Sequence, residues 1–194
     1  GFEKNNSIKS INPRLSSRLF KEGGYCVLRN SSNNCKEEIL MMDCGELGYP
    51  FMAPHGHADL LSITLSADGI DLLIDPGTYL YHTGGEWRDY FRSTRAHNTI
   101  TINDQNQSEI KGPFMWGKRP VARVDEWEVS DRKDLISASC RNPGISHKRS
   151  VYFYKKEALW VVQDSITASG KNIIRQYFHM GQDSAIKELS SNII

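Results

Sequence analysis

Two histidines separated by a single residue, His55 and His57 in "APHGHAD", are the side chains whose types and spacing most suggest chemistry. In an extended segment, residues two apart project to the same side, so both imidazoles would face one pocket. Asp75 in "IDPG" closes the hairpin that follows, and His97 in "RAHNT" starts the next expected strand. Two imidazoles and one carboxylate are a common zinc ligand set, with water in the fourth position. The pattern predicts that three linked segments converge on one site.

The same residues also have an ordinary structural explanation. His57 and Asp59 would cap a strand, and His97 would pack against Trp87. Asp75, which precedes Pro-Gly, is a common turn former. On spacing alone, this explanation is favoured over a metal site. No role is assigned to the three remaining histidines, His82, His147 and His179.

Short apolar or alternating runs must position these groups. Residues 25–29 ("YCVLR") and 39–43 ("ILMMD") form one expected hairpin, and residues 60–75 form a clearer one around the "ADG" turn. In the second half, four runs alternate with a period of two, which predicts one buried and one wet face: "LISASC", "KRSVYFYK", "ALWVVQDSI" and "NIIRQYFHM". The pattern predicts an all-β fold, an antiparallel two-sheet β-sandwich.

Two segments depart from this pattern. Residues 1–22 are expected to be a lead-in segment, and residues 23–194 one domain. "RLSSRLFKE" (14–22) is the best helix candidate, although it is short. Residues 76–93, rich in Gly, Tyr, Trp and Arg, have no period, and a long aromatic loop of this kind usually carries function.

Composition narrows the function classes. The 194 residues are 39% hydrophobic and 24% charged, with a net charge of +1, which indicates a soluble globular chain. No basic cluster suggests a nucleic-acid partner, and no apolar stretch approaches the roughly 20 residues that span a membrane. The four cysteines form no CxxC motif, so no cysteine zinc site is expected. Cys26, Cys44 and Cys140 are expected to be buried thiols, and a Cys26–Cys35 bridge stays open.

A family resemblance changes the balance between these alternatives. "HGHADLLSITL", "LLIDPGTYLY", "WRDYFRSTRAHNTI" and "QSEIKGPFMWG", in this order, resemble the β-sandwich domain of the heparinase II/III-like polysaccharide lyases. In that family an α/α toroid precedes the sandwich, and the polysaccharide binds between them. No helical repeat is visible here, so the resemblance implies that the chain is the sandwich portion of a larger lyase. It also favours a bacterial periplasmic or secreted location.

The resemblance also assigns residues. His55 matches the histidine that points into the substrate cleft, and it is the catalytic candidate. His57, Asp75 and His97 match the ligands of a structural Zn2+ ion. Arg92 and Asn98 would brace the loop or meet a sugar. The candidate substrate contacts are Tyr81, Trp87, Tyr90 and Arg92.

The implied reaction is β-elimination on an acidic polysaccharide such as heparin, heparan sulfate or an alginate-like glycan. A base removes the proton α to the uronate carboxyl, and an acid protonates the leaving oxygen. Histidine suits such work because it titrates near neutral pH. Related lyases take the tyrosine acid/base from the toroid, so the isolated domain is expected to lack full activity.

Three other functions stay open. A non-catalytic carbohydrate-binding module would stack Trp87, Tyr90, Trp116 or Trp127 on sugars, although core packing is favoured for Trp127 and Trp160. A cupin-like metal enzyme is disfavoured, because an apolar run, and not Glu, follows the His-x-His pair. A degenerate lyase relative in polysaccharide metabolism is the third.

Overall fold

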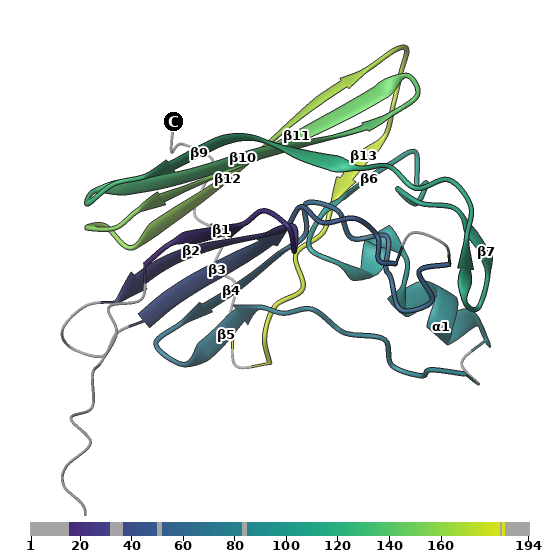
Figure 1. The fold of residues 1–194 in the computed structure, drawn as a ribbon, viewed down its shortest axis with the longest axis horizontal. Helices are drawn as coiled ribbons and strands as arrows, with labels where there is room; N and C mark the ends of the chain where they lie inside the picture. The colour runs from purple at the N-terminus through teal and green to yellow at the C-terminus, as the bar shows by residue number, and fades with distance from the viewer. Residues whose placement is uncertain (1–15, 32–36, 50–51, 83–84, 183, 185–194) are drawn as a thin grey trace, which may run out of the picture.

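A computed structural model of the chain describes residues 16–31, 37–49, 52–82, 85–182 and 184. Two antiparallel sheets lie face to face, with α1 and β7 beyond one end of them (Figure 1). The first sheet has the order β1-β2-β3-β4-β5. The second has the order β12-β11-β10-β9. The predicted antiparallel two-sheet β-sandwich is therefore confirmed.

Each sheet is built from consecutive hairpins. The first contains β1 (Arg18–Phe20), β2 (Tyr25–Ser31), β3 (Glu37–Asp43), β4 (Ile63–Ala67) and β5 (Ile70–Leu73). The second contains β9 (Ala122–Val129), β10 (Lys133–Asn142), β11 (Ile145–Tyr154) and β12 (Leu159–Ala168). Two small pairs complete the fold: β6 (Ile100–Ile102) with β13 (Ile174–Gln176), and β7 (Ile110–Gly112) with β8 (Met115–Trp116).

The core lies between the two large sheets. The first sheet contributes Cys26, Leu28, Leu40, Met42 and Ile63, and the second contributes Ile136, Ala138, Val151 and Phe153. These positions alternate along their strands, as the period of two predicts. Trp127 and Trp160 pack against this core as expected, the latter stacked on Phe153 at a centroid distance of 3.7 Å.

The predicted "ADG" hairpin is present between β4 and β5. Asp68 and Gly69 both have positive φ, at 53° and 79°. Two consecutive left-handed residues are what a two-residue turn matched to twisted strands requires. This hairpin carries the chain from the His57 segment to Asp75.

Several local expectations are wrong. The described part of the helix candidate 14–22 forms strand β1, which pairs with β2, so the lead-in contributes to the first sheet. The aperiodic segment 76–93 contains helix α1 (Gly85–Phe91). In β10 the expected wet face is buried as well, because Ser137 hydrogen-bonds Ser150 across the strands at 2.9 Å.

The cysteine expectations have separate outcomes. Cys26, Cys44 and Cys140 are buried free thiols, as expected. Cys35 lies outside the described residues. No helix within those residues is long and apolar enough to cross a bilayer.

Arg149 of β11 joins the second sheet to the segments that surround the histidines. Its side chain is fully buried and forms two hydrogen bonds of 2.8 Å with the Asp164 carboxylate. It also donates to the backbone carbonyls of Leu61, at 2.8 Å, and Asn98. Burial opposes ionisation of Asp164, but Arg149 and His147 hold its pKa below the ordinary value.

We expect Arg149→Met to lower the free energy of unfolding by about 3–5 kcal/mol, because Asp164 would keep a buried charge without its main partner. The neighbouring substitution Lys148→Met removes only an exposed ion pair with Glu126 and should leave stability nearly unchanged. Urea unfolding monitored by fluorescence measures both. Equal small effects would show that Arg149 does not hold the sheets together.

Candidate functional site

The His-Gly-His segment lies in an irregular loop between β3 and β4, and its glycine is required by packing. A Cβ atom at Gly56 would lie 1.7 Å from the backbone oxygen of Leu47. Only glycine allows this approach without displacement of the backbone. The two flanking histidines therefore face different surroundings, with His55 exposed and His57 half-buried.

His57 lies beside His97, as predicted. Their ring centroids are 5.1 Å apart, although His97 precedes β6 by three residues and does not begin it. The carboxylate of Asp59, which was not assigned as a ligand, lies beside both rings. One potential ligand atom from each of His57, Asp59 and His97 lies within 4.8 Å of the others. Two of the three predicted ligands thus meet, together with Asp59.

Asp75, the third predicted ligand, contacts His97 directly. Its Oδ2 lies 2.6 Å from His97 Nδ1, and its Oδ1 accepts a hydrogen bond from the Gly77 backbone N–H. His97 is fully buried, and its Nε2 forms no hydrogen bond of ordinary geometry with any described residue. In this structure Asp75 therefore orients the His97 ring, and the assignment of Asp75 as a metal ligand stays a prediction.

The two imidazoles have opposite electrostatic environments. Burial lowers the pKa of His57 to about 4, and the neighbouring His97 contributes to this. Burial also acts against protonation of His97, but the hydrogen bond to Asp75 and the charges of Asp59 and Asp75 raise its pKa above the ordinary value. At neutral pH His57 consequently presents an unprotonated ring.

Three carboxylates influence one another around these rings. Burial raises the pKa of Asp59, and burial together with the charge of Asp59 raises the pKa of Asp43 to about 7. Burial acts in the same direction on Asp75, but its hydrogen bond with His97 leaves its pKa below the ordinary value. Asp43 is at the end of β3 and was not recognised from the sequence.

This donor set fits a divalent cation. It offers an unprotonated imidazole, a second imidazole fixed by a carboxylate, and the carboxylate of Asp59, which burial disfavours as an isolated anion. Zn2+ is bound by such nitrogen and oxygen ligands, and ligating histidines commonly donate their second N–H to a carboxylate. His57 and His97 would hold the ion, with Asp59 or Asp75 as the acidic ligand.

His55 lies at the edge of the same region. It stacks on Tyr81 with ring centroids 5.2 Å apart, and it lines an open groove of about 560 Å³. His57, Asp43 and Tyr25 line this groove too, so both histidines of the pair face it as expected. The charge of Asp43 raises the pKa of Tyr25, which keeps that hydroxyl protonated.

An exposed aromatic patch continues from the groove onto α1. We define it as Tyr79, Tyr81, Trp87 and Tyr90, with exposures of 60%, 46%, 61% and 38%. Three of the predicted substrate contacts, Tyr81, Trp87 and Tyr90, are therefore accessible; Trp87 and Tyr90 contact each other, and Tyr81 contacts His55. Tyr79 was not among the predicted substrate contacts, and its exposure adds it to the patch.

Two arginines, Arg88 in α1 and Arg92 directly after it, face inward. Arg92, the fourth predicted substrate contact, is fully buried and donates to the carbonyls of Gly112 and Pro113 at 2.8 and 3.0 Å. It also lies over the ring of Trp116, itself buried. A sugar cannot reach Arg92 in this position. The assignment of Arg92 as a substrate contact is therefore corrected: it braces the loop. Trp116 is buried too and cannot stack on a sugar.

Arg88 was missed by sequence reasoning. It is 3% exposed and donates to the carbonyls of Pro54, Leu80 and Pro113 at 2.9–3.2 Å. It thus ties the residue before His55 to the loop that carries Tyr81. The signal was the four-residue spacing of Arg88 and Arg92, which places both on one face of a helix once α1 is recognised.

Comparisons with known proteins agree with this architecture. The fold and the cluster define a β-sandwich with a histidine–carboxylate centre beside an aromatic groove. Residues 12–194 match the family Heparinase II/III-like, C-terminal, and the chain belongs to this family.

Its curated relatives are longer proteins. The heparin-sulfate lyase of Bacteroides stercoris is 26% identical over 191 residues, which cover 92% of this chain and 26% of that protein. The heparin-sulfate lyase of Pedobacter heparinus is 27% identical over 61% of this chain and 17% of its own length. The chain therefore spans about a quarter or less of these relatives.

Solved structures share the fold. The heparan sulfate lyase HepC from Pedobacter heparinus superposes with a TM-score of 0.63 at 24% identity, over 78% of this chain and 22% of that one. A heparinase III with methylated lysines gives a TM-score of 0.72 at 22% identity, over 91% and 25%.

The carboxylate cluster predicts a pH dependence for the metal-free protein. Because the native pKa of Asp43 is about 7 and its ordinary value 3.8, the native state binds more protons between these values. The contribution of Asp43 to stability should therefore fall as pH rises from about 4 to about 7, while the lowered pKa of His57 acts in the opposite direction, so Asp43→Asn should gain stability relative to wild type over this range. Urea unfolding in chelator measures it. Asp71→Asn, at an exposed position of β5, is the control, and an equal slope in Asp43→Asn and wild type would contradict the assignment.

Proposed function

We propose that the chain is the β-sandwich portion of a polysaccharide lyase that cleaves heparan sulfate-type glycans by β-elimination. The observation that carries the proposal is His55, exposed on an open groove and stacked on Tyr81 beside a buried histidine–carboxylate centre. The names of the relatives supply the substrate class. An α/α toroid elsewhere in the full-length protein would form the opposite wall.

His55 takes the role of base or of uronate-carboxylate partner. The proton α to a uronate carboxyl is weakly acidic, so charge that develops on the carboxylate needs a nearby compensating group. An exposed imidazole held by ring stacking can accept a proton or donate a hydrogen bond at neutral pH. Arg88 positions it through Pro54, and the aromatic patch supplies flat surfaces for sugar rings.

The cation would be structural. His57 and His97 come from segments on either side of the β4–β5 hairpin, so an ion bound to both would cross-link these segments. It would also compensate the charges of Asp59 and Asp75. Through Gly56, it would fix the direction of the loop that carries His55.

We expect His55→Ala to lower kcat of the toroid-bearing enzyme by about 10²–10⁴-fold, the usual contribution of a general acid or base. The measurement is the ultraviolet absorbance of the unsaturated product from heparan sulfate. His179→Ala, at a residue that does not line the groove, is the control. The 194-residue chain alone should give no turnover; robust cleavage by it, or full activity of His55→Ala, would contradict the proposal.

The metal assignment makes a separate prediction. His57→Ala and His97→Ala should abolish Zn2+ binding, and Asp75→Asn should weaken it at least ~10-fold, whether Asp75 binds the ion or orients His97. Binding of the ion to the native state should also raise the melting temperature, and a chelator should reverse this. Isothermal titration and thermal unfolding are the measurements.

Two further variants complete this test. Asp59→Asn decides which acid is the ligand, because the family resemblance favours Asp75 and the distances favour Asp59. Asp71→Asn should bind zinc as wild type does. Wild-type affinity in His57→Ala and His97→Ala would remove the metal from this site.

A carbohydrate-binding module is the second candidate, favoured by the exposure of Trp87 and Tyr79. It differs from the lyase in one measurable respect. Glycan binding by the toroid-bearing protein without any unsaturated product would support the module and contradict the lyase.

A further inference from the structure

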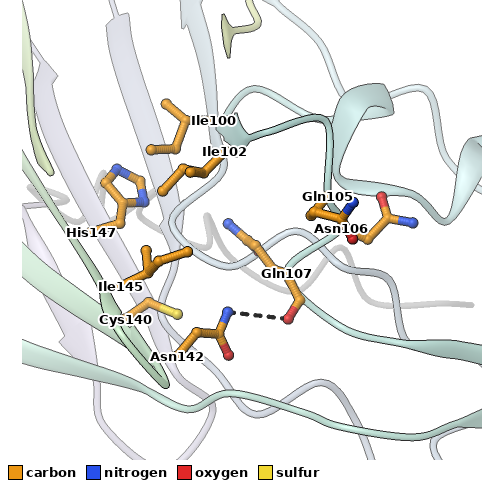
Figure 2. Close-up of a pocket in the computed structure, with 9 residues that line it drawn as sticks. All are labelled: Ile100, Ile102, Gln105, Asn106, Gln107, Cys140, Asn142, Ile145 and His147. Carbon is orange, nitrogen blue, oxygen red and sulfur yellow. Dashed lines mark hydrogen bonds between the residues drawn. The ribbon is translucent and has the colours of Figure 1, made fainter. Parts of the chain in front are cut away.

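A small cavity of about 50 Å³ lies between β6, the turn that follows it and the β10–β11 hairpin (Figure 2). It shares no lining residue with the groove at His55. Three isoleucines form the apolar part of its wall, and the polar part consists of Cys140, Asn142, His147, Gln107, Gln105 and Asn106. The lyase reaction proposed above uses none of these residues.

His147 on β11 is arranged like a metal-binding histidine. It is 5% exposed, and its Nε2 lies 2.7 Å from Asp164 Oδ1. Because Arg149 keeps Asp164 ionised, Nε2 is the nitrogen that donates to this carboxylate, and in the neutral ring Nδ1 then presents a lone pair. Nδ1 is buried with no hydrogen-bond partner in the described part of the chain, and Figure 2 shows one ring nitrogen turned toward the cavity. A carboxylate that fixes the far nitrogen is the usual support of a ligating histidine.

Cys140 is the partner of His147 across the two strands. The register places these residues directly opposite each other, so their side chains leave the same face of the sheet with Cβ atoms about 4.5–5.5 Å apart. The thiol is free, 5% exposed and part of the cavity wall. The two residues are seven positions apart in the sequence, so a search for CxxC motifs could not identify this pair.

Two amide oxygens at the cavity wall also lack a hydrogen-bond partner among the described residues. The Gln107 amide nitrogen donates to Leu60 O and Thr99 Oγ1, so its Oε1 is left buried without a partner among the described residues. The Asn142 amide nitrogen donates to Gln107 O at 3.4 Å, the dashed line in Figure 2, and Asn142 Oδ1 is unpartnered in the same sense. Every unsatisfied group at the wall is thus an electron-pair donor, so the complementary occupant accepts electron pairs.

We propose that this cavity is a second metal site, in which His147 Nδ1 and Cys140 Sγ bind a thiophilic divalent cation of the Zn2+ class. Sulfur and imidazole select such ions over Mg2+ or Ca2+, which prefer oxygen. The amide oxygens of Asn142 and Gln107, or waters bonded to them, complete the coordination. A cavity of about 50 Å³ holds an ion with one or two waters.

Binding at this site releases a proton. Burial raises the pKa of the Cys140 thiol to about 11, so the group is protonated at neutral pH when no metal is present. The cation displaces this proton to solvent as the metal–sulfur bond forms, so one H+ leaves for each ion bound. Affinity should consequently increase as pH rises.

Cobalt titration tests the proposal, because Co2+ bound to a thiolate gives a sulfur-to-metal charge-transfer band in the near ultraviolet. The metal-free protein should develop this band with no more than two equivalents of Co2+, because the His57–His97 centre also binds the ion. Cys140→Ser should abolish it, and His147→Gln should weaken Co2+ binding at least ~10-fold. His57→Ala, which removes the other candidate centre, should retain it.

Cys26→Ser is the matched control, because Cys26 is also a buried thiol and lies 3.7 Å from Cys44 in the core. It should keep the band, and near-ultraviolet circular dichroism should show each variant folded. If Cys140→Ser does not fold, His147→Gln decides. No band in the wild type, a band that persists in Cys140→Ser, or a crystal soaked in Zn2+ that shows only water in the cavity would overturn the proposal.

Discussion

The position of His97 depends on the side chain of the next residue. The amide nitrogen of Asn98 donates to the carbonyls of Ile63 and Ile74 at 2.7 and 2.8 Å, and its oxygen accepts from the His179 backbone N–H at 2.6 Å. One buried amide therefore joins three backbone segments that lie far apart in the sequence. A side chain that only donates or only accepts cannot satisfy all three, and an unsatisfied buried group costs about 1–3 kcal/mol.

The charge balance of the site follows from this arrangement. Asn98 and Arg149 fix the backbone on one side of His97, and Asp75 fixes the ring on the other. Asp59 and Asp43 then lie in surroundings where burial raises the pKa of each carboxyl. Without an added cation, protons on His97 and on these acids reduce the negative charge of the site. A divalent ion would replace those protons. The rigidity of the loop around His55 would then depend both on metal binding and on pH.

The sequence predicted the parts of the fold that depend on local periodicity. Alternating strands such as β11 and the Asp68–Gly69 turn were recognisable because side-chain direction and turn chemistry are local properties. Strand β1 was not, because its helix-like pattern is overridden by pairing with β2. Helix α1 was hidden because its inward residue is Arg88, followed by the buried Arg92. Both side chains donate to backbone carbonyls, so the segment carries no apolar stripe.

The site was predictable only in part, because the sequence pattern reveals local properties and not tertiary contacts. The order of the motifs predicted that His55, His57 and His97 lie near one another. The fold also brings Asp43 and Asp59 to this region, and the sequence pattern did not identify either as part of the site. Asp43 comes from the end of another strand, and spacing does not reveal which side of an imidazole an acid occupies. Tertiary pairing, which no local pattern encodes, also brought Cys140 to His147.

A crystal structure of the protein grown with Zn2+, with anomalous diffraction recorded on both sides of the zinc absorption edge, tests the central claim most directly. We expect an anomalous peak about 2.0–2.1 Å from one ring nitrogen each of His57 and His97. Zinc bound by the protein with no peak between these two rings would contradict it.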